Sequence, residues 1–316
     1  MFRTKVEIPA PGFNISYHHS VLLLGSCFAE NIGQKLNHSY FEAVVNPFGV
    51  LYNPVSIAKS IELLLENKSF GPKDIFQHNG LWQSFSHSSL FSAIIPEQCL
   101  EKINERLLPA AQKMHQTDIL MLTFGTAWVF ENRENSQVVS NCHKLPANQF
   151  VRRRLSVDEI VKTYAELISR LQYQFPKLQV LFTVSPIRHW KDGAHENNLS
   201  KGILLQAIDA LQSEFSNVHY FPAYEIQLDE LRDYRFYASD MLHPSEPAVD
   251  YIWKRFSDTY FDATTIKIKA ELDQLYSDIS HRPLHPESEE FIKFSTQLSE
   301  RKANLILKYP FLSKRV

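Results

Sequence analysis

The chain has 316 residues, of which 44% are hydrophobic and 22% charged, and its formal net charge at pH 7 is −2. This composition is typical of a globular protein and provides no bulk electrostatic attraction to nucleic acid or to an anionic membrane. The three cysteines (Cys27, Cys99 and Cys142) are odd in number and scattered, which argues against a disulfide scaffold.

The first residues lack the apolar core of a secretory signal. No apolar run approaches the roughly 20 residues that a transmembrane helix needs. We therefore expect a cytoplasmic protein. No histidine or cysteine pair has the spacing typical of a zinc site, so we expect neither a metal nor another cofactor.

Strand-like and helix-like segments alternate along the chain. Apolar runs predict strands at 21–24, 43–45, 118–124, 179–184 and 218–221. Apolar stripes with helical spacing predict helices at 28–36, 54–65, 156–171, 203–215 and 248–256, the third opened by a Ser156/Glu159 capping box. Strands that are apolar throughout and separated by helices predict a parallel sheet covered on both faces.

Two regions do not fit this core. Residues from about 70 to 116 are predicted to form an insertion with Trp82, Phe85 and Phe91 in its own core. Residues 263–316 are predicted to form a charged helical extension, broken by Pro283, Pro286 and Pro310. Because no linker is visible, we expect one elaborated domain over 1–262, with the extension packed on it.

Ser26 follows the first apolar strand and precedes the first helix, so its hydroxyl is expected at the carboxyl end of a strand. Ligands of open parallel sheets bind at that edge. The loops with Gly49, Gly125–Thr126, Ser185 to His189, and Asp240 to His243 also lie in or beyond such strand ends. Ser26 has two interpretations: a helix N-cap, which serine favours, or a nucleophile.

His243 favours the second interpretation, because an imidazole can act as a general base near neutral pH. Asp240, three residues earlier, could orient that ring through its other nitrogen. The alternative is an ordinary loop histidine before Pro244. Backbone N–H groups of Ser26, Gly49, Gly125 and Thr126 are candidate donors to an oxyanion, although both glycines could simply serve turn geometry.

Several motifs together resemble the GSCFA family, a bacterial group within the SGNH/GDSL hydrolase superfamily. They are Gly25-Ser26-Cys27-Phe28-Ala29, Asn46-Pro47-Phe48-Gly49, Thr123 to Trp128, Ser185 to Trp190, and Asp240 to Pro244. The resemblance implies a flavodoxin-like three-layer α/β/α fold and a hydrolase or transferase acting on O-acyl esters. It also implies Ser26 as nucleophile, His243 as base, Asp240 as orienting acid and Gly49 as oxyanion donor.

The chain departs from the superfamily pattern at two points. Leu24 stands before Gly25-Ser26, so the usual aspartate of the Gly-Asp-Ser turn is absent. The third motif reads Gly125-Thr126-Ala127-Trp128, so the asparagine that completes the oxyanion hole in the superfamily is missing. Thr126 or another group is expected to replace it.

Further residues are candidates for substrate binding. Arg188 could bind a carboxylate or phosphate and Trp190 could stack on a sugar, with His189 between them; the alternative for Arg188 is a pair with an acid in 225–233. Asn46 is also a candidate, and so is His143, which otherwise belongs to a surface hairpin. Cys27 is interpreted as a small buried hydrophobe pointing away from the site.

Three functions remain open from the sequence. The first is a serine esterase that removes acyl groups such as acetyl from a carbohydrate or small metabolite through an acyl-enzyme on Ser26. The second is an O-acyltransferase that uses the same residues. The third is a binding module with a decayed site, which the missing asparagine keeps open.

Overall fold

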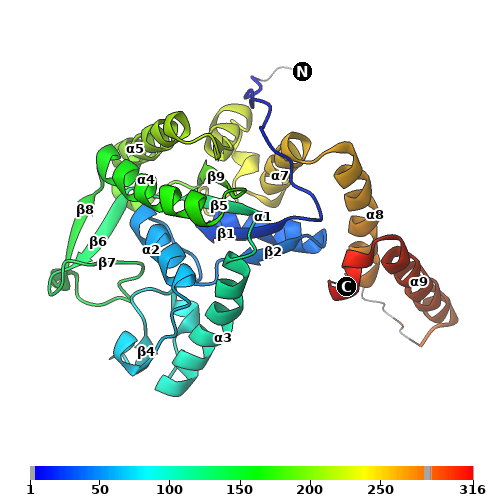
Figure 1. The fold of residues 1–316 in the computed structure, drawn as a ribbon, viewed down its shortest axis with the longest axis horizontal. Coiled ribbons are helices and arrows are strands. Elements are labelled where there is room, and N and C mark those ends of the chain that lie inside the picture. Colours follow the sequence, from blue (N-terminus) through cyan, green and yellow to red (C-terminus); the bar gives the residue numbers. More distant parts are fainter. Residues whose placement is uncertain (1–3, 281–284, 286, 316) are drawn as a thin grey trace.

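A five-stranded parallel sheet forms the centre of the computed structural model, which describes residues 4–280, 285 and 287–315 (Figure 1). Its strands are β1 (Ser20–Gly25), β2 (Glu42–Val45), β5 (Ile119–Phe124), β9 (Gln179–Val184) and β10 (Val218–Tyr220). They lie in the order β10-β9-β5-β1-β2, and each neighbouring pair is parallel. This is the 2-1-3-4-5 order of flavodoxin-like folds, so the predicted sheet is confirmed.

Helices cover both faces of this sheet, because successive side chains of each buried strand point to opposite sides. Leu22 and Leu24 of β1 belong to one apolar core, whereas Val21 and Leu23 belong to the other. The first core is closed by α2 (Pro54–Leu65), α3 (Pro96–Met114), α4 (Val157–Gln174) and α5 (Gly193–Glu214). The second is closed by α1 (Cys27–His38) and α7 (Glu246–Tyr260), so the three-layer prediction is confirmed.

Local signals in the sequence set where these helices begin. The Ser156 hydroxyl accepts the Glu159 N–H at 3.1 Å, and the Glu159 carboxylate accepts the Ser156 N–H at 2.7 Å, as the capping box predicts. Ser245 precedes α7 as predicted, but its hydroxyl donates to the Arg235 carbonyl at 3.1 Å instead of capping the helix.

The segment expected as an insertion contains two different structures. A small hairpin, β3 (Phe76–His78) and β4 (Leu81–Gln83), lies outside the main sheet. The expected separate core of the insertion is wrong for two residues, because Phe91 is buried in the first core and Trp82 packs against it. Helix α3 is also part of the first core, where Cys99, Ile103 and Leu107 are buried. It is the crossover helix that returns the chain to β5.

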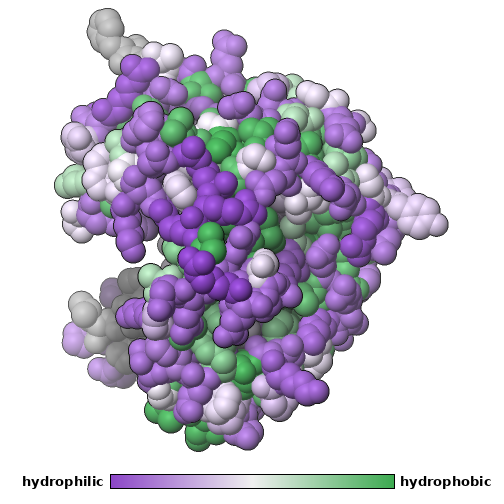
Figure 2. All heavy atoms as spheres, turned by 90° about the vertical axis from the view of Figure 1, so that its left-hand side faces the viewer, coloured by the Kyte–Doolittle hydropathy of each residue, from purple (hydrophilic) through white to green (hydrophobic). Residues whose placement is uncertain are grey.

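A second small sheet follows β5 and was not predicted. It consists of β6 (Trp128–Asn132), β7 (Val138–Val139) and β8 (Phe150–Arg154), all antiparallel, on the left of Figure 1. The face of the protein on that side is mostly hydrophilic, with separate hydrophobic areas (Figure 2). The short helical turns of the described residues are Pro72–Asp74, Ser89–Phe91, Ala147–Gln149, Trp190–Asp192, Ala223–Glu225, Ile226–Glu230, Tyr234–Phe236 and Pro310–Lys314.

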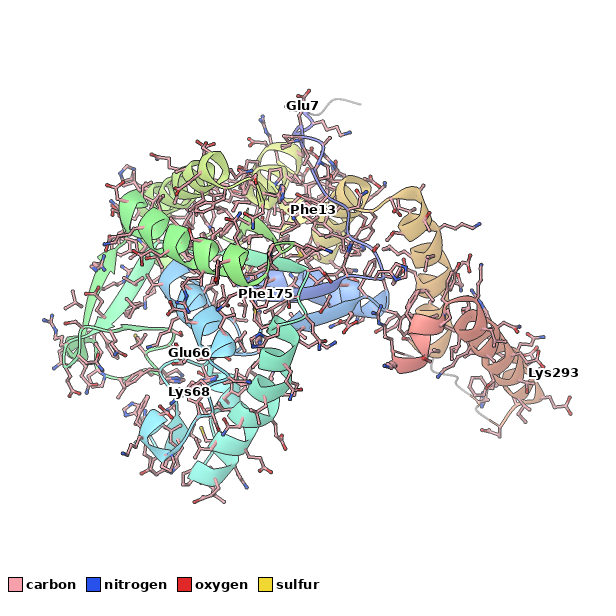
Figure 3. All side chains as sticks on the ribbon, viewed as in Figure 1. Glu7, Phe13, Glu66, Lys68, Phe175 and Lys293 are labelled. Atoms are coloured by element: carbon pink, nitrogen blue, oxygen red, sulfur yellow. The ribbon has the colours of Figure 1, made fainter. Side chains whose placement is uncertain are left out.

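The chain ends with α8 (Ala263–Ser280) and α9 (Glu289–Lys308), as the predicted helical extension requires. Pro283 and Pro286 lie outside the described residues. The Arg315 guanidinium ties the extension to the main body, because it donates to the Tyr17 carbonyl at 3.1 Å and to Glu42 at 2.8 Å. Lys293 points outward from the far part of α9 (Figure 3).

The N-terminal segment crosses the second core. Phe13 packs there against Tyr260, with ring centroids 5.4 Å apart (Figure 3). Among the helices that the structure describes, none has the length and apolar character needed to cross a membrane.

Candidate active site

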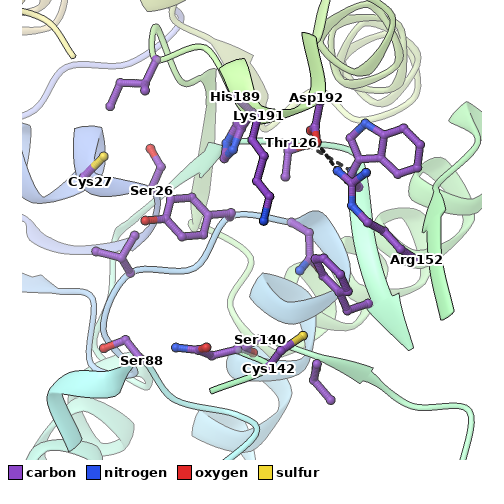
Figure 4. A pocket seen from close by; sticks show the side chains of 18 of the residues that line it. Ser26, Cys27, Ser88, Thr126, Ser140, Cys142, Arg152, His189, Lys191 and Asp192 are labelled. Carbon is purple, nitrogen blue, oxygen red and sulfur yellow. Dashed lines mark hydrogen bonds and ion pairs between the residues drawn. The ribbon is translucent and has the colours of Figure 1, made fainter. Parts of the chain in front are cut away.

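A cavity of about 1050 Å³ opens at the carboxyl ends of the central strands (Figure 4). Ser26 follows β1, Thr126 follows β5 and Ser185 follows β9, and all three line it together with His243. The strand order reverses between β1 and β5, and such a switch point is where open parallel sheets bind ligands. The sheet topology therefore brings together residues that are more than 200 positions apart.

Ser26 is both a helix cap and a wall of the cavity. Its hydroxyl accepts the Phe28 N–H at 3.3 Å, which begins α1, and only 1% of the residue is exposed. Gly25 before it has φ +142°, and a Cβ there would lie 2.3 Å from the Thr123 carbonyl oxygen. Only glycine allows β1 and β5 to approach this closely, and that approach fixes the position of Ser26.

His243 and Asp240 form a pair on the loop before α7. The ring Nδ1 of His243 lies 2.5 Å from an Asp240 carboxylate oxygen, and both side chains are about half exposed. The His243 and Leu242 N–H groups also donate to Asp240, each at 2.9 Å. These hydrogen bonds, that from the His243 backbone first, lower the pKa of Asp240 to about 2, so this carboxylate is ionised at neutral pH.

No hydrogen bond joins Ser26 to His243 among the described residues, although both line the cavity. Catalytic hydrogen bonds of this kind commonly tighten only when substrate binds. The cavity thus brings Ser26 and His243 to one place, with the contact between His243 and Asp240 already made.

Gly49 lies in the tight turn after β2, and its N–H donates to the Asn46 carbonyl at 2.8 Å. Its φ is +75°, and a Cβ there would lie 2.0 Å from the Ser88 hydroxyl. Asn46 is fully buried, and its side-chain oxygen accepts the Gly25 N–H at 2.9 Å. Neither Gly49 nor Asn46 is among the residues that line the cavity, and both instead shape the turn behind Ser26.

The other expected oxyanion donors are also engaged within the protein. The Gly125 and Thr126 N–H groups donate to the Tyr52 carbonyl at 2.8 and 3.0 Å. The Ser26 N–H donates to the Thr123 carbonyl at a longer 3.3 Å. The backbone groups expected from the sequence would have to give up these bonds to bind an oxyanion.

Asn53 is a cavity residue that the sequence analysis missed. Its side-chain oxygen accepts the Ser56 N–H at 2.8 Å and begins α2. Because this bond fixes the orientation of the amide, the amino group remains for the cavity. In the sequence, the Asn53-Pro54 pair indicates only the start of a helix, so it did not predict that Asn53 lines the cavity.

Cys27 differs from its prediction, because it is only partly buried and lines the cavity beside Ser26 (Figure 4). Burial raises the pKa of its thiol, so the nucleophilic thiolate is disfavoured. Its backbone N–H is the first of α1 and donates to no backbone carbonyl in the described part of the chain. A helix N-terminus of this kind presents free N–H groups to an anion.

Arg188, His189 and Trp190 all line the cavity. No carboxylate of the described residues lies within ion-pair distance of Arg188, so the alternative of a pair with an acid in 225–233 is not observed. Burial lowers the pKa of His189 to about 4, and its ring meets Tyr52 edge-on at 5.5 Å. Trp190 is 53% exposed at the mouth of the cavity.

His143 is placed away from the cavity lining. It is buried, and its Nε2 lies 2.8 Å from the Ser84 carbonyl oxygen. Its neighbours Asn141 and Cys142 do line the cavity. The surface hairpin expected here is wrong: residues 140–146 form a loop after β7 that is part of one wall, with the buried His143 behind it.

Lys201 of α5 lies entirely inside the protein under the cavity. Its ammonium donates to the carbonyls of Gly125 and Ser185, each at 2.7 Å, so it joins the loops after β5 and β9. Burial lowers its pKa to about 7. The sequence could have indicated that Lys201 is buried, because it falls on the same helical face as the apolar residues Leu204 and Ile208.

In the part of the chain that the structure describes, no group of three or more histidine, cysteine, aspartate or glutamate side chains could hold a metal ion.

Residues 20–256 match the sequence profile of one known family. The chain belongs to the GSCFA family. No curated protein matches it. Solved structures also match, with low similarity, and two of them are described here. One is a Streptococcus pneumonia protein described as a candidate platelet activating factor, 13% identical with a TM-score of 0.38, covering 77% of this chain and 84% of that chain. The other is an acetyl xylan esterase from the rumen bacterium Butyrivibrio proteoclasticus, 12% identical with a TM-score of 0.38, covering 77% of this chain and 63% of that chain.

The GSCFA region includes both ends of the site, from Ser26 to His243. Its boundary falls within α7, so α8 and α9 lie beyond the GSCFA match.

Proposed function

We propose that this GSCFA protein is a serine ester hydrolase of the SGNH type that removes an acyl group, such as acetyl, from an O-acyl ester of a carbohydrate or small metabolite. The observation that carries the proposal is that Ser26 and His243 line one cavity at the switch point of the sheet, with Asp240 bound to the ring Nδ1 of His243. This combination supplies a nucleophile, a base and a group that orients the base.

In this mechanism His243 takes the proton of the Ser26 hydroxyl as the oxygen attacks the ester carbonyl. Asp240 accepts the Nδ1–H of the ring, which leaves Nε2 free to act as the base. Collapse of the tetrahedral intermediate expels the alcohol, which takes its proton from His243. Water then attacks the acyl-enzyme, with His243 again as base, and releases the acid.

The negative oxygen of the intermediate needs donors that are not already engaged. We assign this role to the amide of Asn53 and the backbone N–H of Cys27, both of which belong to residues that line the cavity. Asn53 would then replace the asparagine that is missing from the Gly125-Thr126-Ala127-Trp128 motif.

Labelling with a fluorophosphonate tests the proposal, with the modified peptide identified by mass spectrometry. We expect an adduct on Ser26 in the wild type and little adduct in His243→Ala. A folded wild-type protein that is never labelled and does not hydrolyse simple acetyl esters would contradict the proposal. Addition of an alcohol acceptor during turnover separates hydrolysis from acyl transfer, because only transfer yields an acylated acceptor.

A further inference from the structure

Positively charged side chains outnumber negatively charged ones in the lining of the cavity. Besides His243, the cavity is lined by three cations, Arg152, Arg188 and Lys191, and by a single carboxylate, Asp192. Asp192 forms an ion pair with Arg152, which joins β8 to the loop after β9 (Figure 4). Asp240, just outside the lining, is engaged with His243. Two cations, Arg188 and Lys191, therefore remain without an opposite charge.

Lys191 extends its side chain across the cavity in Figure 4, and its ammonium makes neither a hydrogen bond nor an ion pair with any described residue. Arg188 is half-buried; its guanidinium contacts the Tyr224 hydroxyl, whereas its Nε is buried without a hydrogen-bond partner. Placing a guanidinium in a partly desolvated position costs free energy unless an anion compensates it. Both side chains can therefore bind an anion without breaking an existing ion pair.

Two asparagines that line the cavity have side-chain oxygens that are already hydrogen-bonded within the protein. The side-chain oxygen of Asn53 is engaged by the Ser56 N–H, and that of Asn141 by the His143 N–H, at 2.8 Å each. These acceptors are occupied, whereas the Asn53 amino group and the Lys191 ammonium are not. The free groups among these three side chains are therefore donors, which suits a ligand that brings acceptor oxygens.

The surroundings add positive potential. Lys201 lies beneath the cavity. Burial of His189 is the main cause of its lowered pKa, the charge of Lys201 is the next, and Arg152 acts in the same direction. Asp192 opposes them. An anion near His189 would be attracted by the same groups.

We propose that the ester substrate carries an oxyanion group, a carboxylate or a phosphate, on the part that is not the acyl group, and that Lys191 and Arg188 bind it. This inference rests on the proposed ester hydrolysis and deepens it by naming the substrate class. An anionic O-acyl compound, such as an acylated acidic sugar or an acylated phosphate ester, fits this arrangement of donors.

Binding to a variant without the nucleophile tests this class directly. Ser26→Gly is used because glycine is tolerated at an N-cap. Isothermal titration calorimetry compares 4-acetoxybenzoate and 4-acetoxyphenyl phosphate with the neutral 4-acetoxybenzamide. We expect at least one anionic ester to bind about tenfold more tightly than the amide, the difference that one charge-assisted hydrogen bond supplies. Which anion binds better distinguishes a carboxylate substrate from a phosphate substrate.

The double variants Ser26→Gly/Lys191→Gln and Ser26→Gly/Arg188→Gln should each lose most of that preference. The matched control Ser26→Gly/Lys162→Gln should retain it, because Lys162 is an exposed lysine of α4 outside the cavity. Equal binding of neutral and anionic esters, no binding of either, or a preference that survives both cavity substitutions would overturn the inference. Wild-type hydrolysis of 4-acetoxybenzamide reports separately on the ester hydrolase, so the two proposals can fail independently.

Discussion

His243 and Asp240 are held together through both side chain and backbone: the ring Nδ1 lies 2.5 Å from one carboxylate oxygen, and the His243 N–H donates to the other at 2.9 Å. The aspartate therefore fixes the loop and the tautomer of the ring together. The spacing of three positions allows this double contact, which leads to the first prediction.

Asp240→Asn should reduce kcat without unfolding the loop. The asparagine oxygen can still accept the backbone N–H groups, but its amino group would donate to Nδ1 and move the ring proton to Nε2, where a base is needed. Because the pair is about half exposed, we expect a loss of about 10²-fold. Steady-state kinetics and circular dichroism measure the two effects.

Asp233→Asn is the matched control, since Asp233 also accepts a backbone N–H two residues on, at 2.9 Å from Arg235, and does not line the cavity. It should retain full activity. An Asp240→Asn protein that also retains full activity would remove Asp240 from the mechanism.

Ser26→Ala should abolish turnover and fluorophosphonate labelling, and should lower the free energy of unfolding by about 1 kcal/mol, because the cap of α1 is lost. Ser156→Ala removes the equivalent cap of α4, which lies outside the cavity. Its unfolding free energy should fall by a similar amount while its activity is retained. If Ser156→Ala also lost activity, the effect of Ser26→Ala would be a matter of stability and not of chemistry.

Asn53→Asp separates the cap of α2 from the proposed oxyanion contact. The carboxylate can still accept the Ser56 N–H, but it cannot donate to an oxyanion and would repel it. We expect kcat to fall by about 10²- to 10³-fold with little change in Tm. Asn132→Asp keeps the analogous side-chain oxygen acceptor, for the Glu134 N–H, at a site outside the cavity and is the control. Unchanged kcat in Asn53→Asp would assign the oxyanion contact to other donors.

The sheet was predictable because its signals are local. The run 118–124 is mostly apolar and its strand β5 is buried at every position, and the Ser156 capping box is satisfied by residues three apart. The small sheet of β6, β7 and β8 was not predictable from the sequence. Its register depends on pairing Trp128 with Arg154, 26 positions later, and no alternation of apolar and polar residues indicates its strands.

Within the candidate site, the meeting of Ser26 and His243 in one cavity could be inferred from strand ends, because parallel topology brings those ends together. The proposed donors to the oxyanion could not be inferred from the sequence. Whether an N–H is free depends on tertiary contacts such as Gly125 with the Tyr52 carbonyl, which no local pattern reveals.

Gly49→Ala should destabilise the fold more than Gly80→Ala. Both glycines have φ +75°, so alanine is strained at each by about 1–2 kcal/mol. Only at Gly49 would the new Cβ also meet another group, the Ser88 hydroxyl at 2.0 Å, whereas at Gly80 nothing lies within 4 Å. Urea unfolding should show a further loss of about 1–3 kcal/mol for Gly49→Ala. Equal losses for the two variants would mean that Ser88 moves aside.

Lys201 should make stability depend on pH in a defined window. Its pKa is about 7 in the folded protein and 10.5 as the ordinary value, because burial disfavours the charged form. Between these values the unfolded chain binds more protons, so the contribution of Lys201 to the free energy of unfolding rises with pH. The slope is at most about 1.4 kcal/mol per pH unit.

Lys201→Met removes this titration together with the two bonds to the Gly125 and Ser185 carbonyls. At pH 10 the neutral amine of the wild type still donates to those carbonyls, so the wild type should be more stable than the variant, and this advantage should shrink as the pH falls to 7. Urea titrations across this range measure the difference, with the exposed Lys162→Met as control. A stability difference that stays constant from pH 7 to 10 would show that Lys201 does not titrate in this window. Its hydrogen bonds alone would then account for its position between the two loops.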